Sequence, residues 1–138
     1  MNISKELFYA ILSMDSYNVG YDQQLNIDQN TIGIDKNGIG DAARLLTSAT
    51  NANSKEYKDG FFASAYSLGG NIVIAYRGTD APWDFITGYG VGLGVPGGPQ
   101  ATDSIEFYRQ VAGILGNPGG NPFTPNIDVT GHSMGAGL

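Results

Sequence analysis

The stretch Ile127-Asp128-Val129-Thr130-Gly131-His132-Ser133-Met134-Gly135 decides the fold. Its first four residues form a short β-prone run, and Gly131-x-Ser133-x-Gly135 is the nucleophile-elbow pattern. A serine on a tight turn between a strand and a helix projects its hydroxyl from the sheet edge. Side chains two residues to either side would collide with the neighbouring strand and helix, so both positions require very small residues. The pattern predicts that Ser133 is a nucleophile; a glycine-rich turn without chemistry is the alternative.

The residues near the amino terminus predict two helices separated by a loop. Apolar residues at helical spacing, with Ser4 available as the N-cap, predict a helix over residues 5–16. Residues 17–38 are polar and predict a loop. Asp41 is the expected cap of a second helix, whose apolar stripe is Ala42, Leu45, Leu46 and Ala49.

The middle of the chain predicts a hairpin followed by a third helix. Residues 61–67 and 71–76 are β-prone runs separated by Leu68-Gly69-Gly70, and residues 72–75 are continuously apolar, which is typical of a strand covered on both faces. Residues 103–106 form a capping box that predicts the start of a helix. The expected inward residues of that helix are Ile105, Tyr108, Val111, Ala112 and Leu115. The alternation predicts an α/β fold, with helices on both faces of a sheet.

Composition and charge exclude several classes of protein. The chain has 138 residues, a net charge of -6 and no cysteine, which excludes disulfides and thiolate metal sites. No basic patch is present for nucleic acid, so we expect no nucleic-acid partner. We expect no amino-terminal signal peptide and no integral membrane segment, because no apolar run is long enough. The expectation is a soluble protein that is cytoplasmic or exported by a signal outside this chain.

Two motifs resemble those of a known family. Residues 75–80, Ala-Tyr-Arg-Gly-Thr-Asp, followed by Trp83-Asp84-Phe85, and residues 129–138, which contain the Ser133 pattern, are similar to the class 3 lipase group of α/β-hydrolases. The similarity runs in order over residues 61–138. The segment 14–21, Met-Asp-Ser-Tyr-Asn-Val-Gly-Tyr, also resembles bacterial lipase-like sequences, less specifically. The departures from the family pattern are Met134 for Leu, Ala136 for Gly, Phe85 for Trp, and no counterpart of a His-x-Gly-Phe stretch.

The resemblance implies a role for each residue that matches the motifs. It implies that Ser133 is the nucleophile and that the backbone N–H groups of Thr79 and Met134 form the oxyanion hole. It also implies that Asp84 supports the oxyanion loop, although a structural ion pair with Arg77 is the alternative. Neither a metal nor an organic cofactor is expected.

The only histidine, His132, adjoins Ser133. Neighbouring side chains on a strand point to opposite faces, so His132 is poorly placed to accept the serine proton. We expect a packing or hydrogen-bonding role for it.

The catalytic triad implied by the resemblance is incomplete. In α/β-hydrolases the acid and the histidine follow the serine along the chain, and residues 134–138 contain neither. We therefore expect residues 1–138 to be the amino-terminal part of a single α/β-hydrolase domain. A complementing carboxy-terminal chain would supply the remainder.

The expected function is hydrolysis of carboxylic esters, with lipid esters favoured. The alternatives are a catalytically inactive lipase-like module that binds or scaffolds, and a hydrolase of the same fold that acts on amides or thioesters. Residues 88–98 are glycine-rich and uncharged, and predict either a flap near the site or a flexible connection. A dinucleotide fingerprint over residues 92–97 is rejected, because Pro96 interrupts it and no strong strand precedes it.

Overall fold

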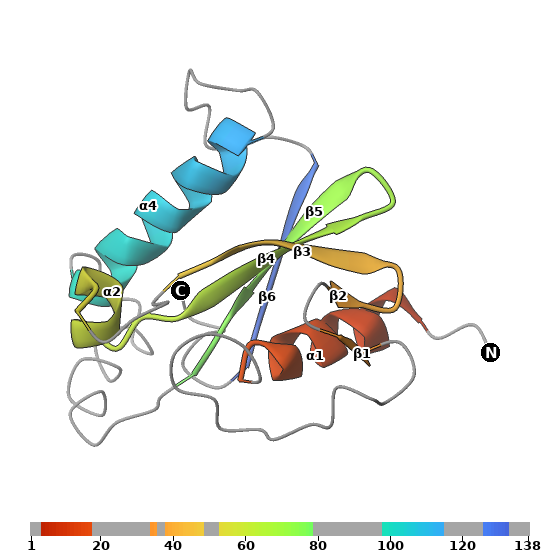
Figure 1. Ribbon diagram of the computed structural model, residues 1–138, viewed down its shortest axis with the longest axis horizontal. Coiled ribbons are helices and arrows are strands. Elements are labelled where there is room, and N and C mark those ends of the chain that lie inside the picture. Colours follow the sequence, from red (N-terminus) through yellow and green to blue (C-terminus); the bar gives the residue numbers. More distant parts are fainter. Residues whose placement is uncertain are drawn as a thin grey trace.

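The computed structural model describes residues 4–17, 34–35, 38–48, 53–78, 98–114 and 126–132. In this part of the chain six strands form one mixed sheet in the order β1-β2-β3-β4-β5-β6 (Figure 1). Neighbouring strands are antiparallel except β5 and β6, which are parallel. The elements are α1 (Lys5–Asp15), β1 (Ile34–Asp35), β2 (Gly38–Ile39), β3 (Ala42–Thr47), α2 (Lys55–Lys58), β4 (Ala63–Leu68), β5 (Asn71–Tyr76), α4 (Pro99–Ile114) and β6 (Ile127–Gly131).

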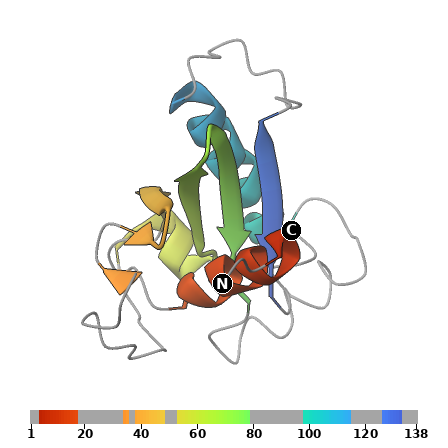
Figure 2. The same ribbon diagram turned by 90° about the vertical axis from the view of Figure 1, so that its right-hand side faces the viewer.

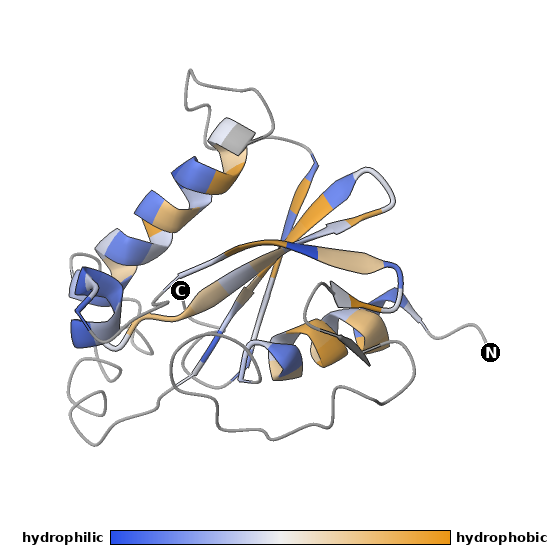
Figure 3. Cartoon of the chain, in the orientation of Figure 1, coloured by the Kyte–Doolittle hydropathy of each residue, from blue (hydrophilic) through white to orange (hydrophobic). Residues whose placement is uncertain are grey.

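Helices α1 and α4 cover opposite faces of the sheet, as the view in Figure 2 shows. The α1 helix packs against β5 and β6. The α4 helix shows alternating hydrophobic and hydrophilic bands (Figure 3), as expected of a helix with one face on a core. The predicted α/β arrangement with helices on both faces of a sheet is confirmed at this level.

The first predicted helix is confirmed almost to the residue. Ser4 caps α1 by accepting a hydrogen bond from the Leu7 N–H at 3.1 Å, and the helix ends at Asp15 with Ser16 as its C-cap. Leu12 is fully buried against the sheet. Residues 18–33 of the predicted loop lie outside the described residues. Near the end of that predicted loop the structure has strands β1 and β2 instead.

The predicted hairpin is also confirmed. Strands β4 and β5 pair from Ala63–Tyr76 to Leu68–Asn71, so only Gly69 and Gly70 form the turn. Both glycines have positive φ angles, 56° and 85°. Two consecutive residues in this region give the hairpin turn whose twist matches the strands, and glycine adopts it without a Cβ penalty.

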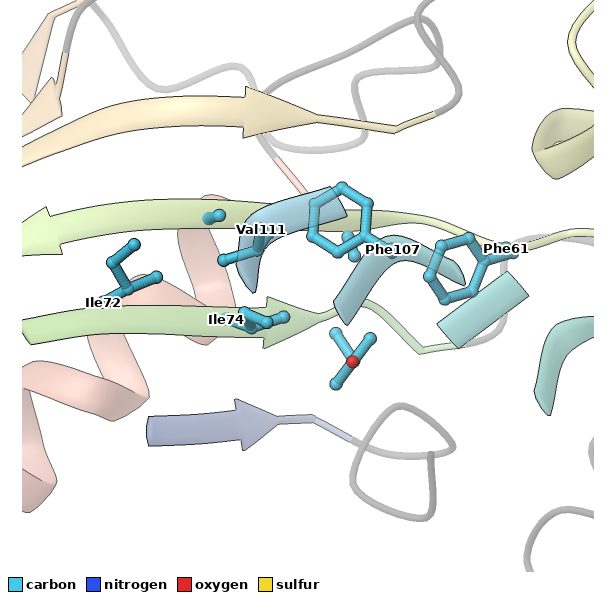
Figure 4. Packing of buried hydrophobic residues seen from close by; sticks show 8 residues of the cluster. Phe61, Ile72, Ile74, Phe107 and Val111 are labelled. Atoms are coloured by element: carbon cyan, nitrogen blue, oxygen red, sulfur yellow. The ribbon is translucent and has the colours of Figure 1, made fainter. Parts of the chain in front are cut away.

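Strand β5 is buried on both faces, as its apolar run predicted. Ile72 and Ile74 face α4 in a cluster with Phe61, Phe107 and Val111 (Figure 4). The alternate residues of β5 face α1, in a second cluster. That cluster contains Leu12, Ile39, Ala42, Tyr66, Val73 and Ala75.

The predicted second helix is wrong, because residues 42–47 form strand β3. This strand pairs with β2 on one side and β4 on the other. A bulge between Arg44 and Leu46 shifts the alternation, so that Ala42 faces α1 while Leu46 packs on the α4 side. The adjacent apolar residues 45 and 46 give the segment the spacing of an apolar helix face. Pairing with β2 and β4 nevertheless makes it a strand, because tertiary contacts outweigh the local pattern. Ala49 lies outside the described residues.

The third predicted helix is confirmed, with most of its predicted buried face, but its start and the inward position of Ile105 are wrong. Helix α4 begins at Pro99, four residues before the capping box, and proline is favoured in the first turn of a helix. Asp103 is buried rather than capping, and Ile105, expected inward, is 54% exposed. Phe107 is buried in its place, together with Val111 and Ala112, while Tyr108 is partly buried. Leu115 lies outside the described residues.

A buried ionic network joins α1 to the sheet. The guanidinium of Arg44 on β3 donates two hydrogen bonds to the Asp15 carboxylate, at 2.9 and 2.7 Å. The Tyr66 hydroxyl on β4 donates a third, at 2.6 Å. The Asp15 side chain is 0% exposed and that of Arg44 is 8% exposed. These bonds fix the carboxyl end of α1 over β3 and β4.

None of the helices in the described ranges is both long enough and apolar enough to cross a membrane.

Replacing Asp15 with Asn should destabilise the fold strongly. The substitution keeps the size of the side chain but removes the buried carboxylate that pairs with Arg44, for which a loss of about 3–5 kcal/mol is expected. Urea unfolding followed by far-UV circular dichroism measures it. Asp128→Asn is the matched control, because its carboxylate is 38% exposed and pairs with the exposed Lys5 at 3.1 Å. Its expected loss is about 1 kcal/mol or less, and equal losses would contradict an anchoring role for Asp15.

Stability should fall in alkali because of the buried tyrosines. Burial, with Tyr108 nearby, raises the pKa of Tyr76 to about 12, and burial also raises the pKa of Tyr66. A raised pKa in the folded state gives stability that is fully present below the unfolded value of about 10 and lost as pH rises through the folded value. For Tyr76 the loss amounts to about 2–3 kcal/mol. Urea unfolding at stepped pH values should therefore show a shallower alkaline decline for Tyr76→Phe than for the wild type; parallel declines would refute the assignment.

Candidate functional site

The parallel pairing of β5 and β6 brings the two family-like motifs together. Tyr76 lies opposite Gly131 in the register, and the His132 N–H donates to the Tyr76 carbonyl oxygen at 3.4 Å. Arg77-Gly78 and His132 therefore leave the sheet side by side, at the carboxyl ends of adjacent strands. Ligand sites of α/β sheets lie at such strand ends.

The four predicted site residues themselves, Thr79, Asp84, Ser133 and Met134, lie outside the described residues. The structure describes the first motif as far as Gly78 and the second as far as His132. Residues 88–97 of the predicted flap also lie outside them. The described strands thus bring together the residues that immediately precede Thr79 and Ser133.

Tyr17 connects the two strand ends. Its hydroxyl accepts a hydrogen bond from the Gly78 N–H at 2.9 Å and lies 3.0 Å from Nδ1 of His132. The Tyr17 and His132 rings meet edge to face, with centroids 5.7 Å apart. The hydrogen-bonding role expected for His132 is therefore the one observed. No motif in the sequence predicts a role for Tyr17. It lies in residues 14–21, however, which resemble lipase-like sequences.

Arg77 packs its charge between aromatic rings. The residue is 2% exposed, and its guanidinium carbon lies 4.9 Å from the Phe62 ring centroid and 5.1 Å from that of Tyr17. A guanidinium over an aromatic face is attracted by the ring quadrupole, more strongly where water is excluded. Arg77 thus holds the end of β5 against the segment after α1. Its predicted partner, Asp84, lies outside the described residues.

Polar contacts along β6 fix α1 in place. Tyr9 donates a hydrogen bond to the Asp128 carboxylate, and the Ser13 and Thr130 hydroxyls lie 2.8 Å apart. The Tyr9 hydroxyl, and next Lys5, lower the pKa of Asp128 by favouring its charged form. Every second residue of a strand points to the same face, so His132 lies on the α1 face with Asp128 and Thr130, toward Tyr17.

A cavity of about 130 Å³ lies on the other face, between α2, α4 and the end of β3. Asp103, Glu106 and Phe107 are among its lining residues. Lys55 already forms ion pairs with Asp103 and Asp59 there. Burial raises the pKa of Asp103, and the contact with Lys55 opposes that rise. This cavity is separate from the cluster at the strand ends, which lies on the α1 face.

Within the described ranges no group of three His, Cys, Asp or Glu side chains is arranged to hold a metal ion. Comparison of the chain with protein-family models, with curated proteins and with solved structures gives no match in any of the three. The assignment of a function therefore depends on the motifs and on the geometry of the strand ends.

Proposed function

We propose that this chain carries the nucleophile and the oxyanion hole of a serine hydrolase with an α/β-hydrolase-like sheet. The observation that carries the proposal is the parallel register of β5 and β6. Because the register ends at Tyr76–Gly131, the segment that leads to Thr79 and the residue that precedes Ser133, His132, leave adjacent strands at the same edge of the sheet. A serine nucleophile and an oxyanion-hole N–H must both lie about 3 Å from one reacting carbonyl group, so the proposal requires such proximity.

The proposed reaction is acyl transfer from a carboxylic ester, with lipid esters as the favoured class. The Ser133 hydroxyl oxygen forms a bond to the ester carbonyl carbon, and its proton passes to a histidine base. The Thr79 and Met134 N–H groups stabilise the oxyanion of the tetrahedral intermediate, each by about 3–4 kcal/mol. The ester C–O bond then breaks and the alcohol leaves with that proton. Water hydrolyses the acyl-enzyme and regenerates the serine.

The histidine base and its acid come, in this proposal, from a complementing carboxy-terminal part. His132 is not the base, because its ring is directed to Tyr17 on the α1 face. Because that contact occupies the one histidine of this chain, it favours the second candidate function. This is a lipase-like module without a working site that binds or scaffolds. Asp84 would support the oxyanion loop in either case.

A fluorophosphonate probe tests the proposed function. The protein is treated with the probe together with any polypeptide that copurifies, and the mass of every chain is recorded. We expect one adduct, at Ser133, and its loss in Ser133→Ala. Ser67→Ala, a substitution of a partly buried serine on β4, is the control and should keep the adduct.

Nitrophenyl esters of increasing acyl length then report on the substrate class. Faster hydrolysis of long acyl chains supports a lipid ester, whereas preference for an anilide or a thioester identifies the amide or thioester alternative. An unlabelled Ser133 and no ester hydrolysis would leave the binding or scaffold module as the function.

A further inference from the structure

Among the described residues, the Tyr17 side chain hydrogen-bonds to both strand ends, that of β5 and that of β6. Its hydroxyl bonds to Gly78 after β5 and to His132 after β6, which are 61 and 115 residues away along the chain. Tyr17 comes from neither strand but from the residues that follow α1. The hydroxyl thus links three segments that lie far apart in the sequence.

The chemistry of the donors fixes the direction of one of the two bonds. The Gly78 N–H can only donate, so the Tyr17 oxygen accepts there. The hydroxyl can donate to Nδ1 of His132 or accept from it, according to the tautomer of the imidazole. In either direction the hydroxyl links Gly78 to His132.

The position of Tyr17 is itself fixed by buried contacts. Two residues earlier, Asp15 accepts three hydrogen bonds from Arg44 and Tyr66. The Ser16 hydroxyl donates to the Ser13 carbonyl at 2.6 Å, and the Tyr17 N–H donates to the Met14 carbonyl at 3.1 Å. The backbone that carries Tyr17 is thus anchored to β3 and β4.

We propose that Tyr17 is a positioning residue that sets the separation between the Gly78 and His132 strand ends. This inference rests on the proposed function, in which Gly78 precedes an oxyanion residue and His132 precedes the nucleophile. Oxyanion stabilisation needs donors within a few tenths of an ångström of the correct distance, so a link between the two strand ends controls the rate. Tyr17 acts through the backbone of Gly78 and the side chain of His132, and takes no proton from the substrate.

The test compares Tyr17→Phe with Tyr9→Phe. The first substitution keeps the ring and removes the hydroxyl that joins the strand ends. The matched control removes a hydroxyl from α1, the one that bonds Asp128 within β6. With unchanged melting temperatures, we expect the rate of fluorophosphonate labelling at Ser133 to fall about 10- to 100-fold in Tyr17→Phe and to stay unchanged in Tyr9→Phe.

A second readout follows the His132 ring directly. The chain has one histidine, so selective ¹⁵N labelling of the histidine in this chain gives a single ring to follow. We expect the ¹⁵N signal of Nδ1 in the wild type to show the hydrogen bond to Tyr17. Tyr17→Phe should move that signal, because the substitution removes the hydroxyl that bonds Nδ1. A structural role without the Tyr17–His132 bond would leave the spectrum unmoved.

Several outcomes would overturn the inference. Equal labelling rates in Tyr17→Phe and the wild type would leave the proposed hydrolase standing and remove Tyr17 from it. A wild-type Nδ1 signal without a hydrogen bond would do the same even if Tyr17→Phe failed to fold. Absence of labelling in the wild type would instead contradict the proposed function, and the contact between Tyr17 and His132 would then be structural only.

Discussion

The parallel pairing of β5 with β6 is the interaction on which the rest of the structure depends. Strand β5 is paired on both sides and buried on both faces, so its position admits little freedom. Through one register, from Ile72–Ile127 to Tyr76–Gly131, it determines which residues emerge together at the carboxyl edge. A slip of one residue would turn every β6 side chain to the opposite face and would separate Asp128 and Thr130 from their partners on α1.

The second constraint is the burial of Asp15. A carboxylate that is 0% exposed is stable only with its hydrogen-bonding partners, and Arg44 and Tyr66 supply them from two different strands. The carboxyl end of α1 is thereby fixed, and Tyr17 follows it directly. The ring of Tyr17 then meets the Arg77 guanidinium and the His132 ring at the strand ends. Stability and site geometry are coupled through this short segment.

Elements with strong local signals could be predicted from the sequence. Ser4 with its apolar spacing predicted α1, Gly69-Gly70 predicted the hairpin, and the apolar run of β5 predicted burial on both faces. The errors arose where distant pairing decides the outcome. Strand β3 contains a bulge at its centre, so its apolar residues lose the strict alternation that identifies a strand. The capping box at Asp103 lies inside α4, where that carboxylate meets Lys55 instead of the helix terminus.

In the candidate site, too, some features follow from the sequence and others only from the tertiary structure. The sequence by itself determined the two motifs and the strand that enters each of them, and it predicted that His132 is poorly placed as a base, because these depend on residue type and on the two-residue period of a strand. Only the tertiary structure decided that the two motifs emerge side by side and that Tyr17 links them. The two hydrogen bonds of Tyr17 join residues that are 61 and 115 positions apart in the sequence. Such bonds leave no local sequence pattern, since they form only after the strands and α1 have packed.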